Sequence, residues 1–305
     1  MRSPSISLLS VASLAACSWF GVAALRGQQP PATTPPGRLA ADPGAFPLGD
    51  TQGTGSRAKK GPRPVAGPAP HLTDGRPDFG GDGAWYPGFS GNIAETQWKG
   101  VHSADKHVDV PFLPSALELF NHRVETIGKE DPEAQCLPVG VPRYMFDPYA
   151  FQMIQTRDRV LFVFEGDNYL WREVFTNGRE HPANLKPAWL GDSDGHYEGD
   201  TLVIDVTGFN GKAWLDQAGH PQTEKAHLIE RYTRLDSLTL KYEVTIDDPG
   251  AYSKPWTTSN TVRWRPGFEL MENVCNENEK DSQHMLAVPD PERGRRPPGS
   301  IPPDF

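Results

Sequence analysis

Hydrophobic and polar residues alternate along most of the second half of the chain. From Phe151 onward, short runs with apolar side chains at every second position are separated by turn residues, as is typical of β-strands. The pattern predicts strands over residues 159–165, 169–175, 201–206, 226–234, 238–246, 257–264 and 268–275. Turns are predicted at Gly166-Asp167-Asn168, Asn177-Gly178, Leu235-Asp236-Ser237 and Pro266-Gly267. These successive hairpins predict an up-and-down antiparallel meander.

A sheet of about seven or eight such strands tends to curl into a barrel, because closure removes the exposed edges. We therefore predict an all-β fold, with a lipocalin-like barrel as the first choice and a β-sandwich as the alternative. One amphipathic helix is predicted before the strands, with Ser115 near its start and Gly128 at its end. Its apolar residues step by four and three positions onto one face, at Leu113, Leu117, Phe120, Val124 and Ile127.

The two ends of the chain differ from the middle in composition. Residues 1–27 have a positive charge near their start, at Arg2, and then an apolar run. This is the pattern of a secretory signal peptide. Residues 28–75 are predicted to form a Pro-rich disordered tether, residues 76–288 the β-barrel domain, and residues 289–305 a disordered Pro-rich tail. We therefore expect a periplasmic or secreted protein.

The signal segment leaves two alternatives open. Its apolar run could remain as a membrane anchor, although serine residues interrupt it. Leu14-Ala15-Ala16-Cys17 also fits a lipoprotein processing box, in which a lipid on Cys17 would hold the protein at the outer membrane. A membrane is therefore expected as a partner only through that lipid, and cleavage near Gly27 is preferred.

Charge and cysteine content narrow the range of partners. The formal net charge of −9 argues against nucleic acid as a partner. Cys17 lies in the signal segment, which leaves Cys136 and Cys275 for an oxidising compartment. A disulfide between these two is the economical prediction, and two separate buried thiols are the alternative. The sequence does not fix the oligomeric state.

Several phrases in the chain resemble a known family. They are CLPVGVPR, TNGREHP, WLGDSDGHYEGDTLVIDVTGFN, WLDQAGHPQTEKAHLIERYTR, TIDDPGAYSKPW and CNENEKD. Together they resemble a family of secreted bacterial proteins, abundant in acidobacteria and several proteobacteria, over about residues 110–285. The resemblance implies an exported location and a lipocalin-like fold. It implies no activity, cofactor or catalytic residue.

Two predicted strands carry charges among apolar residues. One face of residues 169–175 holds Tyr169, Trp171 and Glu173, and the other holds Arg172. A buried charge is costly unless it is paired, so these residues predict either an aromatic-lined ligand pocket or a structural ion pair at a barrel rim. Tyr232, which shares a strand face with Glu230, is assigned to the same predicted pocket.

Four residues are candidates for acid/base catalysis. Glu230 sits among apolar residues, where a raised pKa would suit proton transfer, but a cross-strand arginine such as Arg263 could also satisfy it. His196, Asp216 and His220 lie in predicted loops, where ordinary turn chemistry is the alternative. No histidine spacing matches a zinc motif, so neither a metal nor a cofactor is predicted.

These observations lead to three functional hypotheses. The first is an exported β-barrel protein that binds a small, partly apolar molecule. The second is a cofactor-independent hydrolase, lyase or isomerase of the same fold. The third is a structural envelope protein, which would have no pocket. The sequence leaves open whether the protein is an enzyme.

Overall fold

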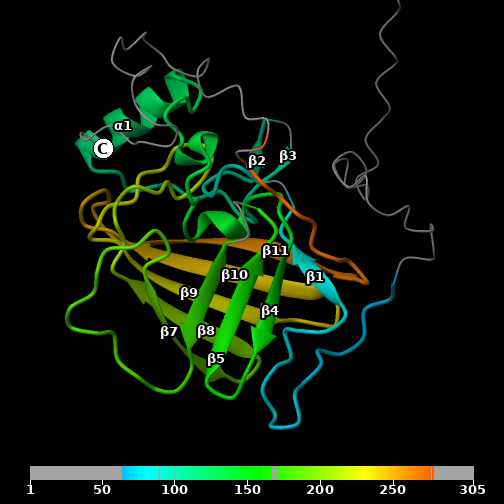
Figure 1. Cartoon of the computed structure of the whole chain (residues 1–305). Helices are drawn as coiled ribbons and strands as arrows, with labels where there is room; N and C mark the ends of the chain where they lie inside the picture. Colours follow the sequence, from blue (N-terminus) through cyan, green and yellow to red (C-terminus); the bar gives the residue numbers. More distant parts are fainter. Residues whose placement is uncertain (1–63, 89, 100, 167–169, 276, 278–305) are drawn as a thin grey trace, which may run out of the picture. The chain divides into compact units, whose positions relative to one another are not determined.

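The protein is a nine-stranded β-barrel. The computed structural model describes residues 64–88, 90–99, 101–166, 170–275 and 277. The strands close in the order β1-β11-β10-β9-β8-β7-β6-β5-β4 (Figure 1). They are β1 (Gly83–Tyr86), β4 (Phe151–Gln155), β5 (Arg159–Phe164), β6 (Trp171–Phe175), β7 (Asp192–Glu198), β8 (Thr201–Thr207), β9 (His227–Arg234), β10 (Thr239–Asp247) and β11 (Trp256–Pro266). A two-stranded sheet, β2 (Gln97–Trp98) and β3 (Val101–His102), lies outside the barrel.

Neighbouring barrel strands are antiparallel with one exception. β6 and β7 run parallel and share the single residue pair Phe175–Asp194, because the chain crosses back through residues 176–191 between them. The barrel closes where Trp85 of β1 pairs with Phe151 of β4. The predicted all-β barrel is therefore confirmed over the β-sandwich, as a mixed sheet with one weakly paired seam.

Two of the strand predictions are wrong in an informative way. Residues 192–198 were expected to form turns because Asp192, Asp194 and Gly195 are turn formers, yet they form β7. The predicted strand at 268–275 is absent from the structure, so Pro266-Gly267 does not form a hairpin. Its place beside β11 is taken by β1, which pairs over four residues.

Large side chains fill the inside of the barrel. In β9 every second residue is buried, so Leu228, Glu230 and Tyr232 point inward. Aromatic residues from opposite strands meet there, with ring centroids of Phe162 and Tyr232 5.3 Å apart. The largest fully buried residues of this core are Trp85, Tyr144, Phe146, Phe151, Phe162, Phe164, Tyr232 and Tyr242. The interior is therefore a packed core.

A short helical segment covers one end of this core. The 3-10 turn η2 (Arg143–Met145) places Tyr144 flat on Phe164, with ring centroids 4.0 Å apart. The Asn260 amide of β11 donates to the Met145 carbonyl oxygen at 2.6 Å. A second 3-10 turn, η1 (Pro132–Gln135), and the helix α1 (Pro114–Glu125) lie at the same end (Figure 1).

The predicted helix forms, but its apolar stripe faces the core only in part: Leu113 packs on the core and Phe120 lies against His220, with ring centroids 4.5 Å apart. Ala116 and Arg123 are its buried residues, whereas Leu117 and Val124 are exposed. Ser115 makes no cap, because the helix starts one residue earlier with Pro114 at its first position. The face predicted from periodicity is therefore only partly buried, and Leu117 and Val124 remain as exposed apolar side chains on α1.

Contacts outside the strands also define the domain. Cys136 and Cys275 form the predicted disulfide, which fits an oxidising compartment. Part of the predicted tether packs on the barrel, since the Gly67 N–H donates to Ser237 Oγ at 2.7 Å. The signal segment and the C-terminal tail lie outside the described residues. Within the described part of the chain, no helix has the length and apolarity needed to cross a membrane.

Removing the disulfide should destabilise the protein substantially. The bond closes a loop with a sequence separation of 139 residues, so Cys136→Ser should lower the free energy of unfolding by about 3–5 kcal/mol. Urea unfolding followed by tryptophan fluorescence measures this loss. Cys275→Ser and the double variant should lose the same amount, because each removes the same cross-link. A parent protein insensitive to dithiothreitol would contradict the prediction.

Candidate functional site

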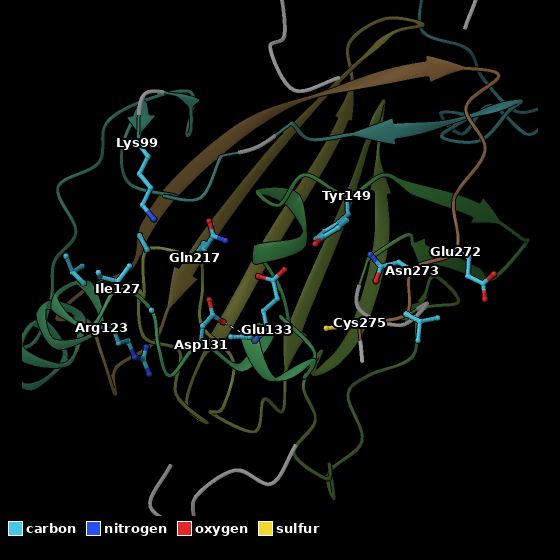
Figure 2. A pocket seen from close by; sticks show the side chains of 15 residues that line it. Lys99, Arg123, Ile127, Asp131, Glu133, Tyr149, Gln217, Glu272, Asn273 and Cys275 are labelled. Atoms are coloured by element: carbon cyan, nitrogen blue, oxygen red, sulfur yellow. Dashed lines mark hydrogen bonds between the residues drawn. The ribbon is translucent and has the colours of Figure 1, made fainter. Parts of the chain in front are cut away.

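A pocket of about 830 Å³ lies between α1, η1 and the chain leading to Cys275. Figure 2 shows Arg123 and Ile127 on one side of the pocket and Tyr149, Glu272 and Asn273 on the other. Asp131 and Glu133, at the start of η1, lie between them. Its lining mixes apolar side chains with charged ones, so it is more polar than most small-molecule sites of this size. Its lining residues are Lys99, Arg123, Val124, Ile127, Gly128, Asp131, Glu133, Ala134, Tyr149, Gln217, Ala218, Glu272, Asn273, Val274 and Cys275.

Arg123 in this pocket is buried but incompletely paired. Its side chain is 7% exposed, lies over the ring of Trp214 at 4.3 Å, and donates from Nη1 to the Gly219 carbonyl oxygen at 3.1 Å. Among the described residues, Nε has no hydrogen-bond partner and no carboxylate forms an ion pair with the guanidinium. Burial lowers the pKa of Arg123 to about 10, so the group stays charged at neutral pH.

Two of the three acids that line the pocket, Asp131 and Glu133, are bound to a different arginine. The fully buried Arg143 of η2 donates to both oxygens of Asp131, at 2.8 and 2.9 Å, and also binds Glu133. Asp147 completes its set of partners at 3.3 Å. Burial raises the pKa of Glu133 even though Arg143 opposes the shift. The carboxylates nearest to Arg123 are therefore already engaged.

Strained backbone is concentrated around the same pocket. Three non-glycine residues among those described have positive φ: Lys99 at 48°, Ile127 at 57° and Cys136 at 57°. Lys99 and Ile127 line the pocket, and Cys136 is bonded to Cys275, which also lines it. Such a conformation is unfavourable for a β-branched residue, and strain of this kind is concentrated at functional sites.

Asp216 and His220, predicted as catalytic, lie behind the loop that forms one wall of the pocket. Asp216 Oδ2 lies 2.7 Å from His220 Nδ1, and the carboxylate also accepts N–H groups of Ile93, Gly219 and His220. Burial would raise the pKa of Asp216, but His220 and these donors together lower it. Both residues are buried and neither lines the pocket, so we assign them to holding the loop that carries Gln217 and Ala218.

Glu230 lies inside the packed barrel and not in a cavity. It binds Arg172 and accepts the hydroxyls of Tyr232 and Tyr242 at 2.9 and 2.8 Å. Arg172 also donates to Ser193 Oγ at 3.0 Å. Two predicted residues from different strands therefore satisfy each other, and Arg263 is not the partner. The structure favours the ion-pair alternative at the centre of the barrel rather than at its rim.

The remaining predicted residues do not form a site. Trp171 is 59% exposed on the outer face, and Glu173 pairs there with Arg159. His196 is exposed on β7 beside Glu198, at 3.0 Å. Tyr169 lies outside the described residues. An inward-facing pocket on β6 is therefore wrong, because the strand turns Trp171 and Glu173 toward solvent.

Sequence reasoning missed the residues that do line the pocket. Arg123 was not singled out in the predicted helix, and η1 was not predicted. In the sequence, Arg123 with Val124 and Ile127 close by forms no motif that would indicate a binding site. Within the described part of the chain, one group has the geometry of a metal site, namely His181, Asp192 and Asp194 on the outer face of the barrel.

The chain matches no protein-family model, no curated protein and no solved structure. The functional argument therefore depends on the geometry of the pocket.

The ion pair inside the barrel should behave as a coupled unit. Arg172→Met or Glu230→Gln alone leaves one buried charge without its partner and should cost about 3–5 kcal/mol of unfolding free energy. The double variant should be more stable than either single variant, because the amide oxygen can still accept both tyrosine hydroxyls. Urea unfolding of the four proteins measures this, and additive losses would refute it.

Ile127 should be replaceable by glycine with a gain in stability. Its side chain is 76% exposed and its φ is 57°, so Ile127→Gly should raise the unfolding free energy by about 1 kcal/mol. Val124→Gly is the matched control, because this exposed residue is helical and its loss should cost about 1 kcal/mol. Thermal unfolding compares the two variants. A loss of stability in Ile127→Gly, as in Val124→Gly, would contradict the assignment of strain.

Proposed function

We propose that this protein is exported and binds a small, partly apolar molecule that carries a carboxylate or a similar anionic group. The site is the pocket between α1, η1 and the chain leading to Cys275. The observation that carries this proposal is the buried, incompletely paired guanidinium of Arg123. The contacts of Arg123 with Trp214 and Gly219 use part of the guanidinium and leave Nε without a partner among the described residues.

The chemistry of Arg123 suits an anionic group. A guanidinium has five N–H donors in a planar fork, and a carboxylate can accept two of them at once. Burial strengthens such a charged hydrogen bond, because water competes less for it. Since Arg143 holds Asp131 and Glu133, a ligand carboxylate would supply the partner that Arg123 lacks.

The rest of the pocket suits an apolar portion of the ligand. Val124, Ile127 and Val274 line it and are all exposed, so a bound molecule would remove their surface from water. The volume of about 830 Å³ is within the range of small-molecule sites. The backbone strain at Ile127 fits a residue retained for binding at a cost in stability.

The N-terminal segment and the disulfide support the exported location in this proposal. The apolar segment after Arg2 and the disulfide between Cys136 and Cys275 agree with a periplasmic or secreted protein. A lipid on Cys17 would place it at the outer membrane. The resemblance to secreted bacterial proteins points to the same compartment.

Acid/base catalysis in the same pocket is the second candidate function. One observation favours it: Glu133 lines the pocket, and burial raises its pKa. A carboxyl group with a raised pKa can transfer protons near neutral pH. The proton-transfer role assigned to Glu230 from the sequence would then belong to Glu133. Conversion of the bound molecule by the parent protein separates the enzyme from the binding protein.

Native mass spectrometry tests the proposal with the natural ligand. The untagged parent protein, purified from the cells that export it, should release a carboxylate-bearing small molecule on gentle denaturation. Arg123→Met retains the packing on Trp214 and removes the donors, so the bound fraction should fall at least about 10-fold. The apo variant, titrated with the released molecule in a calorimeter, gives the loss of affinity.

Arg231→Met is the control for this experiment. Arg231 lies on the outer face of β9, where it binds Glu198 at 2.8 Å, far from the lining residues in the fold. This variant should carry as much ligand as the parent. A released molecule without an anionic group, or equal ligand content in Arg123→Met and the parent, would reject the proposal.

A further inference from the structure

A second cluster of polar side chains lies on the outside of the barrel, at its weakest seam. Arg179 and His181 come from the crossover that follows β6, and Asp192 and Asp194 come from β7. β6 and β7 share only one residue pair, so few backbone hydrogen bonds hold this seam together. The cluster joins the crossover to β7 at that point.

Three atoms of the cluster are arranged like the ligands of a metal ion. His181 Nδ1 lies 2.6 Å from Asp192 Oδ1 and 3.2 Å from Asp194 Oδ2, and all three ligand atoms lie within 4.8 Å of one another. Ligands about 2.1 Å from a tetrahedral metal are about 3.3 Å apart. A small outward movement of Asp192 would therefore open the space that an ion needs.

Asp194 supplies an oxygen whose one recorded contact is the ion pair with His181. Oδ2 is a buried atom with no hydrogen-bond partner among the described residues, although it lies in the ion pair with His181. Its other oxygen, Oδ1, accepts from Arg179 Nε at 2.6 Å. A buried carboxylate oxygen without a donor is costly, and a cation would satisfy it.

The outer contacts of the cluster resemble the second shell of a metal centre. His181 Nε2 lies 3.2 Å from Asp205 Oδ1, which His227 also binds at 2.8 Å. Metal-bound histidines almost always donate their other ring nitrogen to a carboxylate in this way, because the contact fixes the tautomer and the ring orientation. In the metal-free cluster Nδ1 instead donates to Asp192, because a carboxylate only accepts, and a metal ion would displace that proton and take its place between the two aspartates.

Arg179 is compatible with an ion at this position. Its Nη2 donates to both oxygens of Asp192, at 2.8 and 2.7 Å. The guanidinium also lies over the Phe175 ring, 3.6 Å from the ring centroid. Each carboxylate oxygen has two acceptor sites, so Asp192 Oδ1 can serve both Arg179 and a cation. Asp192 and Asp194 would be shared between Arg179 and the ion, and Asp205 adds a third negative charge beside His181.

We propose that His181, Asp192 and Asp194 bind a divalent transition-metal ion of the Zn²⁺, Mn²⁺ or Fe²⁺ class. One imidazole nitrogen and two carboxylate oxygens suit these borderline ions better than Ca²⁺, which prefers oxygen ligands alone. The ion fastens the crossover onto β7 across the weak seam. Water completes its coordination, since three protein ligands leave at least one position open.

Zn²⁺ and Co²⁺ are the probes that test this site. The untagged protein is stripped with a chelator, titrated with Zn²⁺ in a calorimeter, and titrated with Co²⁺ while its visible absorption is recorded. We expect one Zn²⁺ per chain with a dissociation constant in the micromolar range or below, a visible Co²⁺ band, and a Zn²⁺-dependent rise in the melting temperature.

Variants separate this site from casual surface binding. His181→Gln and Asp194→Asn should lower Zn²⁺ affinity at least about 100-fold, and Asp205→Asn about 10- to 100-fold. His196→Gln is the matched control, because this exposed histidine lies on the same strand beside Glu198 and outside the cluster. It should bind Zn²⁺ as the parent does.

Two results would overturn the proposal. One is a parent protein that shows neither the Co²⁺ band nor any rise in melting temperature with Zn²⁺. The other is a Zn²⁺ affinity that His181→Gln leaves unchanged or that His196→Gln lowers equally. Circular dichroism of each variant shows whether it is folded, and for an unfolded variant the milder Asp205→Asn decides.

Discussion

The pocket depends on one buried cation, the guanidinium of Arg143. A charge in this position is tolerated only because Asp131, Glu133 and Asp147 surround it. Those contacts fasten η1 to η2, which covers the end of the barrel through the stacking of Tyr144 on Phe164. They also engage Asp131 and Glu133, two of the three acids that line the pocket, and Arg123 forms no ion pair among the described residues. The electrostatic character of the site follows from that competition.

The barrel itself provides a scaffold and not a container. Its interior is occupied by aromatic side chains and by the paired Arg172 and Glu230, so chemistry has to be placed outside it. Loops at the covered end build the pocket, with Asp216 holding one wall. The crossover between β6 and β7 builds the second polar cluster on the outer face. Both sites therefore lie where the regular meander is interrupted.

Individual residues show how far sequence reasoning reaches. The alternation of Leu228, Glu230 and Tyr232 predicted an inward face, and the structure has it. The same period-two argument failed at residues 192–198, because aspartates and glycine look like turn formers unless their cross-strand partners are known. The apolar stripe of α1 predicted a core face, but Leu117 and Val124 are exposed. Periodicity identifies a face without showing what lies opposite it.

The sequence alone determined the all-β class and the position of most barrel strands, and it left Cys136 and Cys275 as the one pair available for a disulfide, which the structure then showed. These follow from local patterns and from simple counting, which need no knowledge of distant contacts. Only the tertiary structure decided which charges meet: Glu230 with Arg172, Asp131 with Arg143, and Arg123 with no carboxylate. The physical reason is that a charge becomes costly, paired or reactive through its burial and its neighbours, and folding sets both across long separations in the chain.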